Sequence, residues 1–303
     1  MPECYLRDFV GDDDLLWVYD RVARQYRRQP PRVTAVINDY YSYLDGRGVR
    51  RVDVEQGFCQ IEGMYCEVLR KLREQAELEF EDRGALSIFV ALLMTRVPGF
   101  EQEVARWCRE YAIDQLRRQY VEAAGRASES GSEGEPAFSV DELLAYLRDD
   151  RLAVKPSAQT RLVVVLRSAL QAARLFMQMN WLFLTCSSNA AFITSDQPLA
   201  FWGPFDDSGE TPDLVGLTTA GMYKVIPLTS SLCLAIGRRG PAVGRAVVDR
   251  QVVRTINNQV AANCYRFVIG PHERLVRRIV KVTGVDQTDW ESRIIFPGQA
   301  DEN

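Results

Sequence analysis

The spacing of apolar residues changes in kind along this chain, and that change sets the fold class. Between residues 53 and 77, apolar side chains recur every three or four positions, which is the repeat of a helix with one buried face. From Trp181 onward the apolar runs are short, rich in β-branched and aromatic residues, and separated by turn signals. Helices grouped before strands, instead of alternating with them, predict an α+β protein.

The same patterns predict the individual elements. We expect an N-terminal β unit, a helical middle, and a C-terminal mixed or antiparallel sheet with flanking helices. The expected helices are 53–77, 86–94, 100–124, 157–179, 247–263 and 272–282. The expected strands are 15–20, 39–44, 181–186, 191–194, 199–202, 222–228, 231–236 and 265–269. Residues 125–138, rich in Gly, Ser and Glu, are predicted as a flexible loop between two lobes, 1–124 and 139–303, of one globular domain spanning 1–303.

Composition indicates the cellular compartment in which we expect the protein. With 303 residues, 47% of them hydrophobic, the chain can bury a large core without disulfides. Its seven cysteines are odd in number and widely spaced, which favours free thiols in a reducing compartment. The first residues lack the basic start and apolar run of a signal peptide. Polar residues interrupt the apolar region 162–186, so it does not predict a membrane span. We therefore expect a cytoplasmic protein without a membrane partner.

Charge and residue types restrict the chemistry. The net charge of −4 does not support a general nucleic-acid coat, although a local basic cleft stays compatible with it. His272 is the only histidine, so a Ser-His-Asp or Cys-His catalytic site would have to use that residue, and a His-rich zinc or non-haem iron site cannot be built. We find no pattern for a haem, flavin or zinc site. A hard cation such as Mg²⁺ or Mn²⁺ needs only oxygen ligands and is the metal that this sequence can accommodate.

Several short motifs together resemble a known family. They are Pro2–Phe9 (PECYLRDF), Leu16–Asp20 (LWVYD), Asp39–Tyr41 (DYY), Ile61-Glu62, Arg96–Pro98 (RVP), Ile193–Pro198 (ITSDQP), Ile226–Leu228 (IPL) and Asn257. In this order they resemble the bacterial family known as domain of unknown function 4238. The resemblance covers nearly the whole chain. It implies a fold and an outline, and no reaction.

One feature departs from the family pattern. Members usually open with two histidines just before the Val-Pro that leads to the Tyr-Leu pair. This sequence begins at Met1-Pro2, so that pair is absent from it. Either the true start lies upstream, or this member has lost the histidines together with any chemistry that depends on them.

Glu62 and Arg96 are the first candidate pair. Glu62 lies beside Leu69 at the edge of an apolar helical stripe, where a carboxylate needs a partner. It is either one half of a structural ion pair with an arginine of the next helix, or a catalytic or metal-binding acid. Arg96 follows the next apolar helix and is its natural partner. It either serves structure there or clamps a phosphate or carboxylate.

The second candidate region is the turn that contains Ser195 and Asp196. Such side chains commonly hydrogen-bond their own turn, but Asp196 could instead project from a strand end into a cleft. Ser195 as a nucleophile would need a base, which a chain with one histidine does not readily supply. Tyr41, Ser195 and Asn257 are the candidates for substrate contacts, with sheet packing as the alternative for Tyr41.

Two hypotheses follow from these residues. In the first, Glu62 and Asp196 bind Mg²⁺ or Mn²⁺ and Arg96 holds a phosphate, in a metal-dependent hydrolase of phosphate esters or nucleic acid. In the second, the same three residues form a structural network in a non-catalytic binding or regulatory module. Whether the acids face a cleft or are paired with arginines distinguishes the two.

Overall fold

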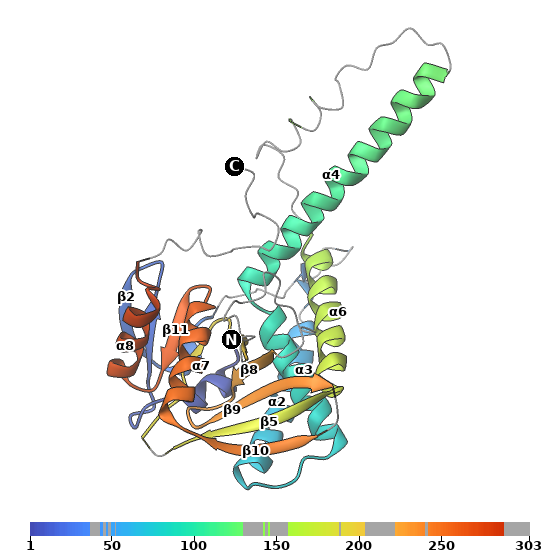
Figure 1. Cartoon of the computed structure of the whole chain (residues 1–303). Helices are drawn as coiled ribbons and strands as arrows, with labels where there is room; N and C mark the ends of the chain where they lie inside the picture. Colours follow the sequence, from blue (N-terminus) through green and yellow to red (C-terminus); the bar gives the residue numbers. More distant parts are fainter. Residues whose placement is uncertain are drawn as a thin grey trace. The chain divides into compact units, whose positions relative to one another are not determined.

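The structure is a computed structural model that describes most of the chain. The described residues are 1–36, 43–44, 47, 50–51, 53–129, 142, 145, 157–187, 189–203, 222–239 and 242–287. The chain divides into two compact units, one made of Met1–Val97 with Val165–Asn303 and the other of Pro98–Val164. Figure 1 shows both sheets in the first unit. The predicted α+β class is confirmed.

The first sheet joins the two ends of the described chain. Its order is β2 (Gln25–Gln29), β1 (Leu16–Asp20), β11 (Phe267–Gly270) and β6 (Thr194–Ser195), and every neighbouring pair is antiparallel. Thus β1, the first strand, pairs with β11, the last strand described.

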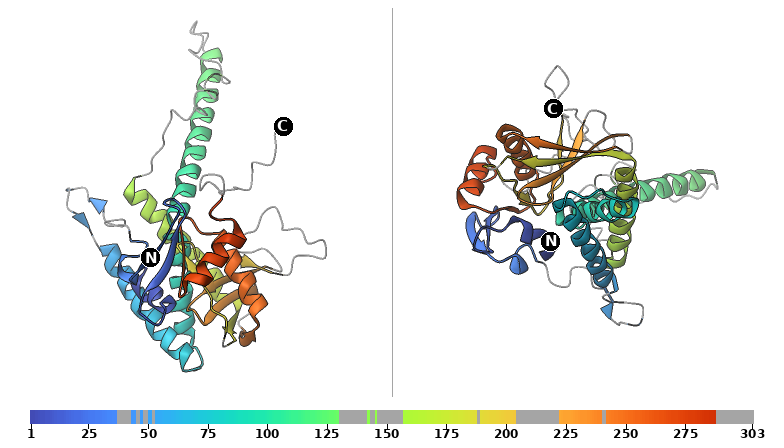
Figure 2. Two further views of the ribbon diagram at one scale, coloured as in Figure 1. Left: turned by 90° about the vertical axis from the view of Figure 1, so that its left-hand side faces the viewer. Right: turned by 90° about the horizontal axis from the view of Figure 1, so that it is seen from below.

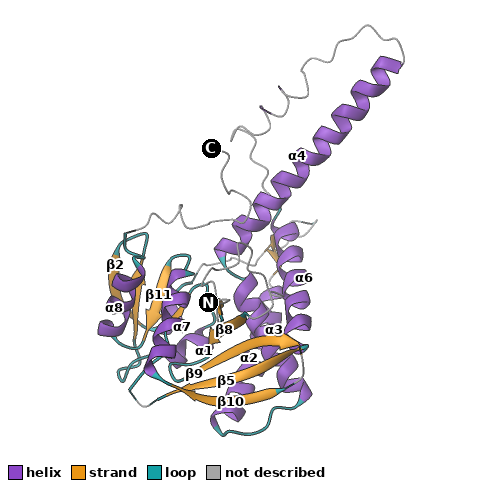
Figure 3. Ribbon diagram, in the orientation of Figure 1, coloured by secondary structure: helices purple, strands orange, loops and turns teal. Residues whose placement is uncertain are grey.

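The second sheet is mixed. Its order is β10 (Val243–Val248), β5 (Met179–Cys186), β9 (Leu232–Arg239), β8 (Tyr223–Pro227) and β7 (Ala200–Trp202). The β10–β5 pair is parallel and the other three pairs are antiparallel, as the expected mixed sheet allows. Figure 3 shows the long strands β5, β9 and β10 side by side. A separate two-stranded ladder joins β3 (Tyr43–Leu44) to β4 (Arg50–Arg51).

Helices account for most of the remaining described residues. They are α1 (Glu3–Leu6), α2 (Asp53–Arg73), α3 (Phe80–Thr95), α6 (Ala158–Met177), α7 (Arg250–Ala262) and α8 (Glu273–Thr283), with 3-10 turns at Arg7–Phe9 and Pro31–Val33. Local signals explain several ends. Asp249 caps α7 by accepting hydrogen bonds from the backbone N–H groups of Gln251 and Val252. Gly284 ends α8 in the left-handed conformation, with φ of 63°, that glycine adopts without strain.

The five-stranded sheet is buried on both faces. Successive strand residues point to opposite faces. On β9, Leu234 and Ile236 therefore join a core cluster with α2, α3 and the part of α6 that belongs to this unit. Cys233 and Ala235 join a second cluster with α7 and α8. Figure 2 shows the two helix groups on opposite sides of the strands. This burial explains why β9 reads as a continuous apolar run.

The second unit contains one long helix, α4 (Pro98–Glu129). It includes the predicted helix 100–124 and runs five residues into the segment predicted as loop. The start of that loop was therefore placed too early, and residues 130–138 lie outside the described residues. Exposed ion pairs one turn apart, such as Arg118–Asp114 at 2.7 Å, lie along this helix.

Other boundaries also differ from expectation. The predicted helix 247–263 begins at Arg250, because Val243–Val248 forms the edge strand β10. The strand expected at 191–194 is the short Thr194–Ser195. The β2 strand was missed because Gln25–Gln29 is polar on both faces. Of the strand expected at 39–44, residues 39–42 lie outside the described residues, while Tyr43–Leu44 is a strand.

Within the described part of the chain, no helix combines the length and apolar content needed to cross a bilayer.

Candidate functional site

Glu62 and Arg96 form an ion pair between neighbouring helices. The Arg96 Nη1 atom lies 3.1 Å from Glu62 Oε1, and the two side chains are 18% and 22% exposed. Arg96 caps the C-terminus of α3, and its guanidinium lies 3.9 Å from the centre of the Phe58 ring on α2. The pairing expected from the helical pattern is present, and aromatic packing fixes the arginine over α2.

Asp196 is buried and clamps the start of β11. Its carboxylate accepts hydrogen bonds from the backbone N–H groups of Tyr265, at 3.0 Å, and Arg266, at 2.8 Å. Its own N–H donates to the Phe267 carbonyl at 3.2 Å. Burial raises the pKa of Asp196 to about 6, although these hydrogen bonds act in the opposite direction. The carboxylate thus serves a segment about seventy residues away, and not its own turn.

The charges of the three predicted residues all act on the amino group of Met1. This amine donates a hydrogen bond to the Ala35 carbonyl at 2.7 Å. Burial, and next the positive charge of Arg96, lower its pKa to about 6, while the negative charges of Asp196 and Glu62 act to raise it. Side chains from α2, from the end of α3 and from the segment after β6 therefore all influence the charge of this part-buried amine.

The thiols of Cys4 and Cys66 lie near Glu62. Burial raises the pKa of Cys4 to about 12, and the neighbouring Cys66 thiol and the charge of Glu62 add to the shift. Sequence reasoning did not place Cys4 here. It could have placed Cys66 on the face of Glu62, because residues four apart on a helix are neighbours.

The remaining predicted residues have different surroundings. Ser195 is buried in β6, and its Oγ atom accepts a hydrogen bond from the Gln197 N–H at 3.2 Å, as a turn serine is expected to do. Asn257 on α7 accepts from the Ile193 N–H at 3.0 Å and donates to the Ala191 carbonyl at 2.8 Å. Both polar ends of Asn257 thus hold the segment that enters β6. Tyr41 lies outside the described residues.

Two buried tyrosines anchor the elements around the site. The Tyr5 hydroxyl donates to the Pro227 carbonyl at 2.7 Å and shares a 2.7 Å hydrogen bond with Thr194 Oγ1. The Tyr65 hydroxyl donates to the Leu228 carbonyl at 3.1 Å, and its ring stacks on Phe89 with centres 3.7 Å apart. Burial raises the pKa of both tyrosines above the ordinary value, so they serve as neutral hydrogen-bonding groups.

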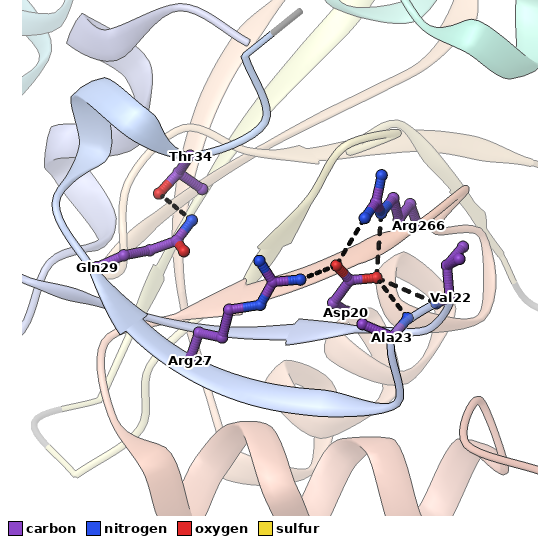
Figure 4. A network of polar contacts seen from close by, with 7 residues as sticks. All are labelled: Asp20, Val22, Ala23, Arg27, Gln29, Thr34 and Arg266. Atoms are coloured by element: carbon purple, nitrogen blue, oxygen red, sulfur yellow. Dashed lines mark hydrogen bonds and ion pairs between the residues drawn. The ribbon is translucent and has the colours of Figure 1, made fainter.

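A second acidic corner lies on the other side of β11. Asp20, fully buried at the end of β1, accepts hydrogen bonds from Arg266 Nε at 3.0 Å and Nη2 at 2.9 Å. Arg27 and the backbone N–H groups of Val22 and Ala23 are also bonded to it, as Figure 4 shows. Sequence reasoning missed this network because Arg27 lies on β2, which was not predicted, and Arg266 lies just before β11, far along the chain.

Glu62 and Asp196 are the two carboxylates that the sequence predicts as metal ligands. The described residues contain no cluster of three or more His, Cys, Asp or Glu side chains placed to hold a metal ion. Two carboxylates suit Mg²⁺, which commonly keeps several waters and takes one or two protein carboxylates together with substrate phosphates. They do not suit zinc, which takes three or four protein ligands.

One protein family matches this chain. The profile of the family described as "Protein of unknown function (DUF4238)" covers residues 1–274. The chain belongs to this family. No curated protein and no solved structure matches it.

Proposed function

We propose that the chain is a metal-dependent hydrolase of phosphate esters, with phosphodiesters including nucleic acid as its substrate class. The observation that supports this is the ion pair between Glu62 and Arg96, whose charges act on the Met1 amine together with that of the buried Asp196. Residues with a perturbed pKa beside specific charge partners are candidates for functional sites. In this proposal Glu62 and Asp196 hold Mg²⁺ or Mn²⁺, and Arg96 holds the phosphate.

The ion pair between Glu62 and Arg96 gives the substrate a role in assembling the site. A guanidinium fork binds two oxygens of a phosphate in one plane, and Arg96 contacts Glu62 through its Nη1 atom. A phosphate that binds Arg96 would strengthen the hold of the Glu62 carboxylate on a cation already bound to the two acids. The bound cation would polarise the phosphoryl oxygen and acidify a water molecule.

Asp196 gives the proposed activity a dependence on pH. With its pKa raised to about 6, the carboxylate is protonated in more acidic solution and loses the charge that a cation needs. Hydrolysis should therefore fall as the pH drops through about 6. Tyr41 and Ser195 stay predicted substrate contacts. Asn257, bonded to backbone at both ends, is better suited to positioning the strand that leads to Asp196.

A structural network in a non-catalytic binding module is the second candidate. It is favoured by one specific observation: Asp196 already accepts two backbone hydrogen bonds and Glu62 already has an arginine partner. In that case the acids stabilise the fold and bind no cation.

Thermal unfolding with and without Mg²⁺ or Mn²⁺ separates the two candidates. We expect the metal to raise the midpoint of the wild type by about 4 °C at roughly one hundred times its dissociation constant. Glu62→Gln and Asp196→Asn should lose that rise while staying folded. Glu67→Gln is the matched control, because Glu67 lies on the same helix and is 69% exposed. It should respond to the metal as the wild type does.

Hydrolysis of a simple phosphodiester completes the test. Arg96→Gln should lose the Mn²⁺-dependent hydrolysis of bis(p-nitrophenyl) phosphate without losing the metal-induced rise in midpoint. The proposal fails if the metal leaves the wild type unchanged while Glu62→Gln and Asp196→Asn lose several kcal/mol of stability. That pattern is the one expected of a structural network.

A further inference from the structure

A cavity of about 540 Å³ lies where the end of α2, the turn between β8 and β9, and the strand β10 meet. Its size is that of a site for a small metabolite. Glu62, Arg96 and Asp196 are not among its lining residues. What this cavity binds is therefore a question separate from the proposed hydrolase site.

The strands β5 and β10 form one wall of the cavity. Residues two apart on a strand share a face, so Thr185 lies on the face of Phe183. The parallel register places Arg245 beside Phe183 and Val247 beside Thr185. The Arg245 guanidinium lies 5.8 Å from the centre of the Phe183 ring. This wall therefore combines a hydroxyl, a guanidinium and the side chain of Val247, which is 77% exposed.

Arg245 offsets the negative partial charge at the C-terminal end of α2, which would otherwise repel an anion from the cavity. The C-terminal carbonyls of a helix carry partial negative charge and repel anions. Arg245 donates hydrogen bonds to the Leu72 carbonyl in the last turn of α2, at 3.3 Å, and to the Ala76 carbonyl just after the helix, at 3.1 Å. Its positive charge compensates the helix end, so an anionic group next to it meets no net repulsion.

Arg73 supplies the cation that a ligand can reach. It is the last residue of α2, its side chain is 58% exposed, and it forms an ion pair with Asp8, which is 14% exposed. Asp8 holds the guanidinium at the cavity while leaving part of its N–H fork toward solvent. A guanidinium in this position can bind phosphate oxygens, and the Asp8 carboxylate can accept hydrogen bonds from ligand hydroxyls.

The turn between β8 and β9 adds hydroxyl groups on a fixed backbone. Thr229 Oγ1 accepts hydrogen bonds from the N–H groups of Ser231, at 3.0 Å, and Leu232, at 2.9 Å. Ser230 and Ser231, which also line the cavity, are half-buried and exposed, respectively. Hydroxyl groups both donate and accept hydrogen bonds, which matches a polyhydroxylated ligand.

We propose that this cavity binds a small sugar phosphate. Arg73 and Arg245 together outweigh Asp8 and the partial negative charge at the end of α2, which leaves a net positive charge for the phosphate. Asp8 and the serine and threonine hydroxyls provide acceptors and donors for the sugar. The Val247 side chain offers an apolar surface against the carbon skeleton.

Isothermal titration of the full chain with glucose 6-phosphate, inorganic phosphate and glucose tests this proposal. We expect glucose 6-phosphate to bind about tenfold more tightly than inorganic phosphate, since the sugar adds hydrogen bonds worth about one factor of ten. Glucose, which lacks the charge, should show no binding in the same range. Inorganic phosphate binding as tightly as glucose 6-phosphate would overturn the assignment of a sugar-bearing ligand.

Two variants with matched controls place the binding in this cavity. Arg73→Gln should weaken glucose 6-phosphate binding about tenfold or more, whereas Arg70→Gln, three residues earlier on α2 and 55% exposed, should not. Val247→Trp should fill the cavity and abolish binding. Val243→Trp, at an exposed position on the same face of β10 and outside the cavity lining, should bind like the wild type. No binding to the wild type, or equal binding to all four variants, would overturn the proposal.

Discussion

Two buried aspartates flank the start of β11, and their pKa values move in opposite directions. Burial acts to raise the pKa of Asp20, but the hydrogen bonds and charge of Arg266, the Ala23 N–H and the charge of Arg27 outweigh it, so its pKa lies below the ordinary value. Asp196, which is 6% exposed, accepts hydrogen bonds from backbone groups, and burial raises its pKa to about 6. A buried carboxylate stays charged most readily where a full positive charge accompanies the hydrogen bonds.

Arg266 connects the two corners. Its backbone N–H donates to Asp196 while its guanidinium binds Asp20 through two nitrogens. Arg266 thus offers Asp196 only the dipole of a backbone N–H group, whereas it offers Asp20 the full positive charge of its side chain. The corner with the guanidinium suits structure, because its charge is compensated. At the other corner, where no guanidinium binds the carboxylate, the pKa of Asp196 lies close to neutral pH. A functional carboxylate needs such a pKa.

The largest effect should follow from removing the compensated charge. Asp20→Asn leaves Arg27 and Arg266 without their carboxylate partner and should lower the free energy of unfolding by about 4 kcal/mol. Urea denaturation at neutral pH measures this. Glu273→Gln is the control, since it breaks an ion pair whose two side chains are 39% and 53% exposed, and should lose at most about 0.5 kcal/mol. If both variants lose equally little, the Asp20 corner contributes no more than an exposed ion pair.

The pH dependence of stability should have opposite signs at the two aspartates. A raised folded pKa gives stability that is present at low pH and is lost as the pH rises through that pKa. Between about pH 4 and pH 7, the wild type should therefore lose about 3 kcal/mol relative to Asp196→Asn. Asp20, with its lowered pKa, gives stability that is lost only as the pH falls below about 4.

Urea denaturation of the wild type, Asp20→Asn and Asp196→Asn across that pH range measures how the free energy of unfolding changes with pH in each protein. A difference between the wild type and Asp196→Asn that stays constant with pH would show that Asp196 ionises like an exposed acid. The comparison between the two corners would then fail.

A neutral clamp should give the smallest effect and no dependence on pH. Asn257 holds the backbone of residues 191 and 193 as Asp196 holds the start of β11, but without a charge. Asn257→Ala should lower the free energy of unfolding by about 2 kcal/mol, because it leaves buried backbone groups without partners. Thr255→Ala, at an exposed position on the same helix, should stay within about 0.5 kcal/mol of the wild type. A loss that varies between pH 5 and pH 8 would mean that Asn257 is coupled to a titrating group.

Sequence patterns predicted the helices and strands that bury apolar side chains on one face or on both faces. The α2 helix was found because Phe58, Tyr65 and Leu69 repeat along one face. The edge strands β2 and β10 were not found. Each has only one neighbouring strand, β2 is mostly polar, and the last two residues of β10 were assigned to the following helix.

The candidate site was predictable only where its partners are local. Glu62 and Arg96 lie on consecutive helices, so their pairing followed from the helical stripe. The partners of Asp196 lie about seventy residues further along the chain, at the start of a strand whose neighbours no local pattern specifies. The Asp20 corner was missed for the same reason, since the Arg266 partner is separated from Asp20 by 246 positions.

The pairing of β1 with β11 has a consequence for synthesis on the ribosome. The β1–β2 hairpin emerges first, but the other neighbour of β1 is made roughly 250 residues later, which takes tens of seconds at about 5–20 residues per second. Tyr5 must likewise wait for Thr194 and Pro227. During that time the hairpin presents an unpaired strand edge, and the Tyr5 side chain lacks the partners of its hydroxyl group. The growing chain is therefore a candidate for chaperone binding through its N-terminal residues, until the last strand closes the sheet.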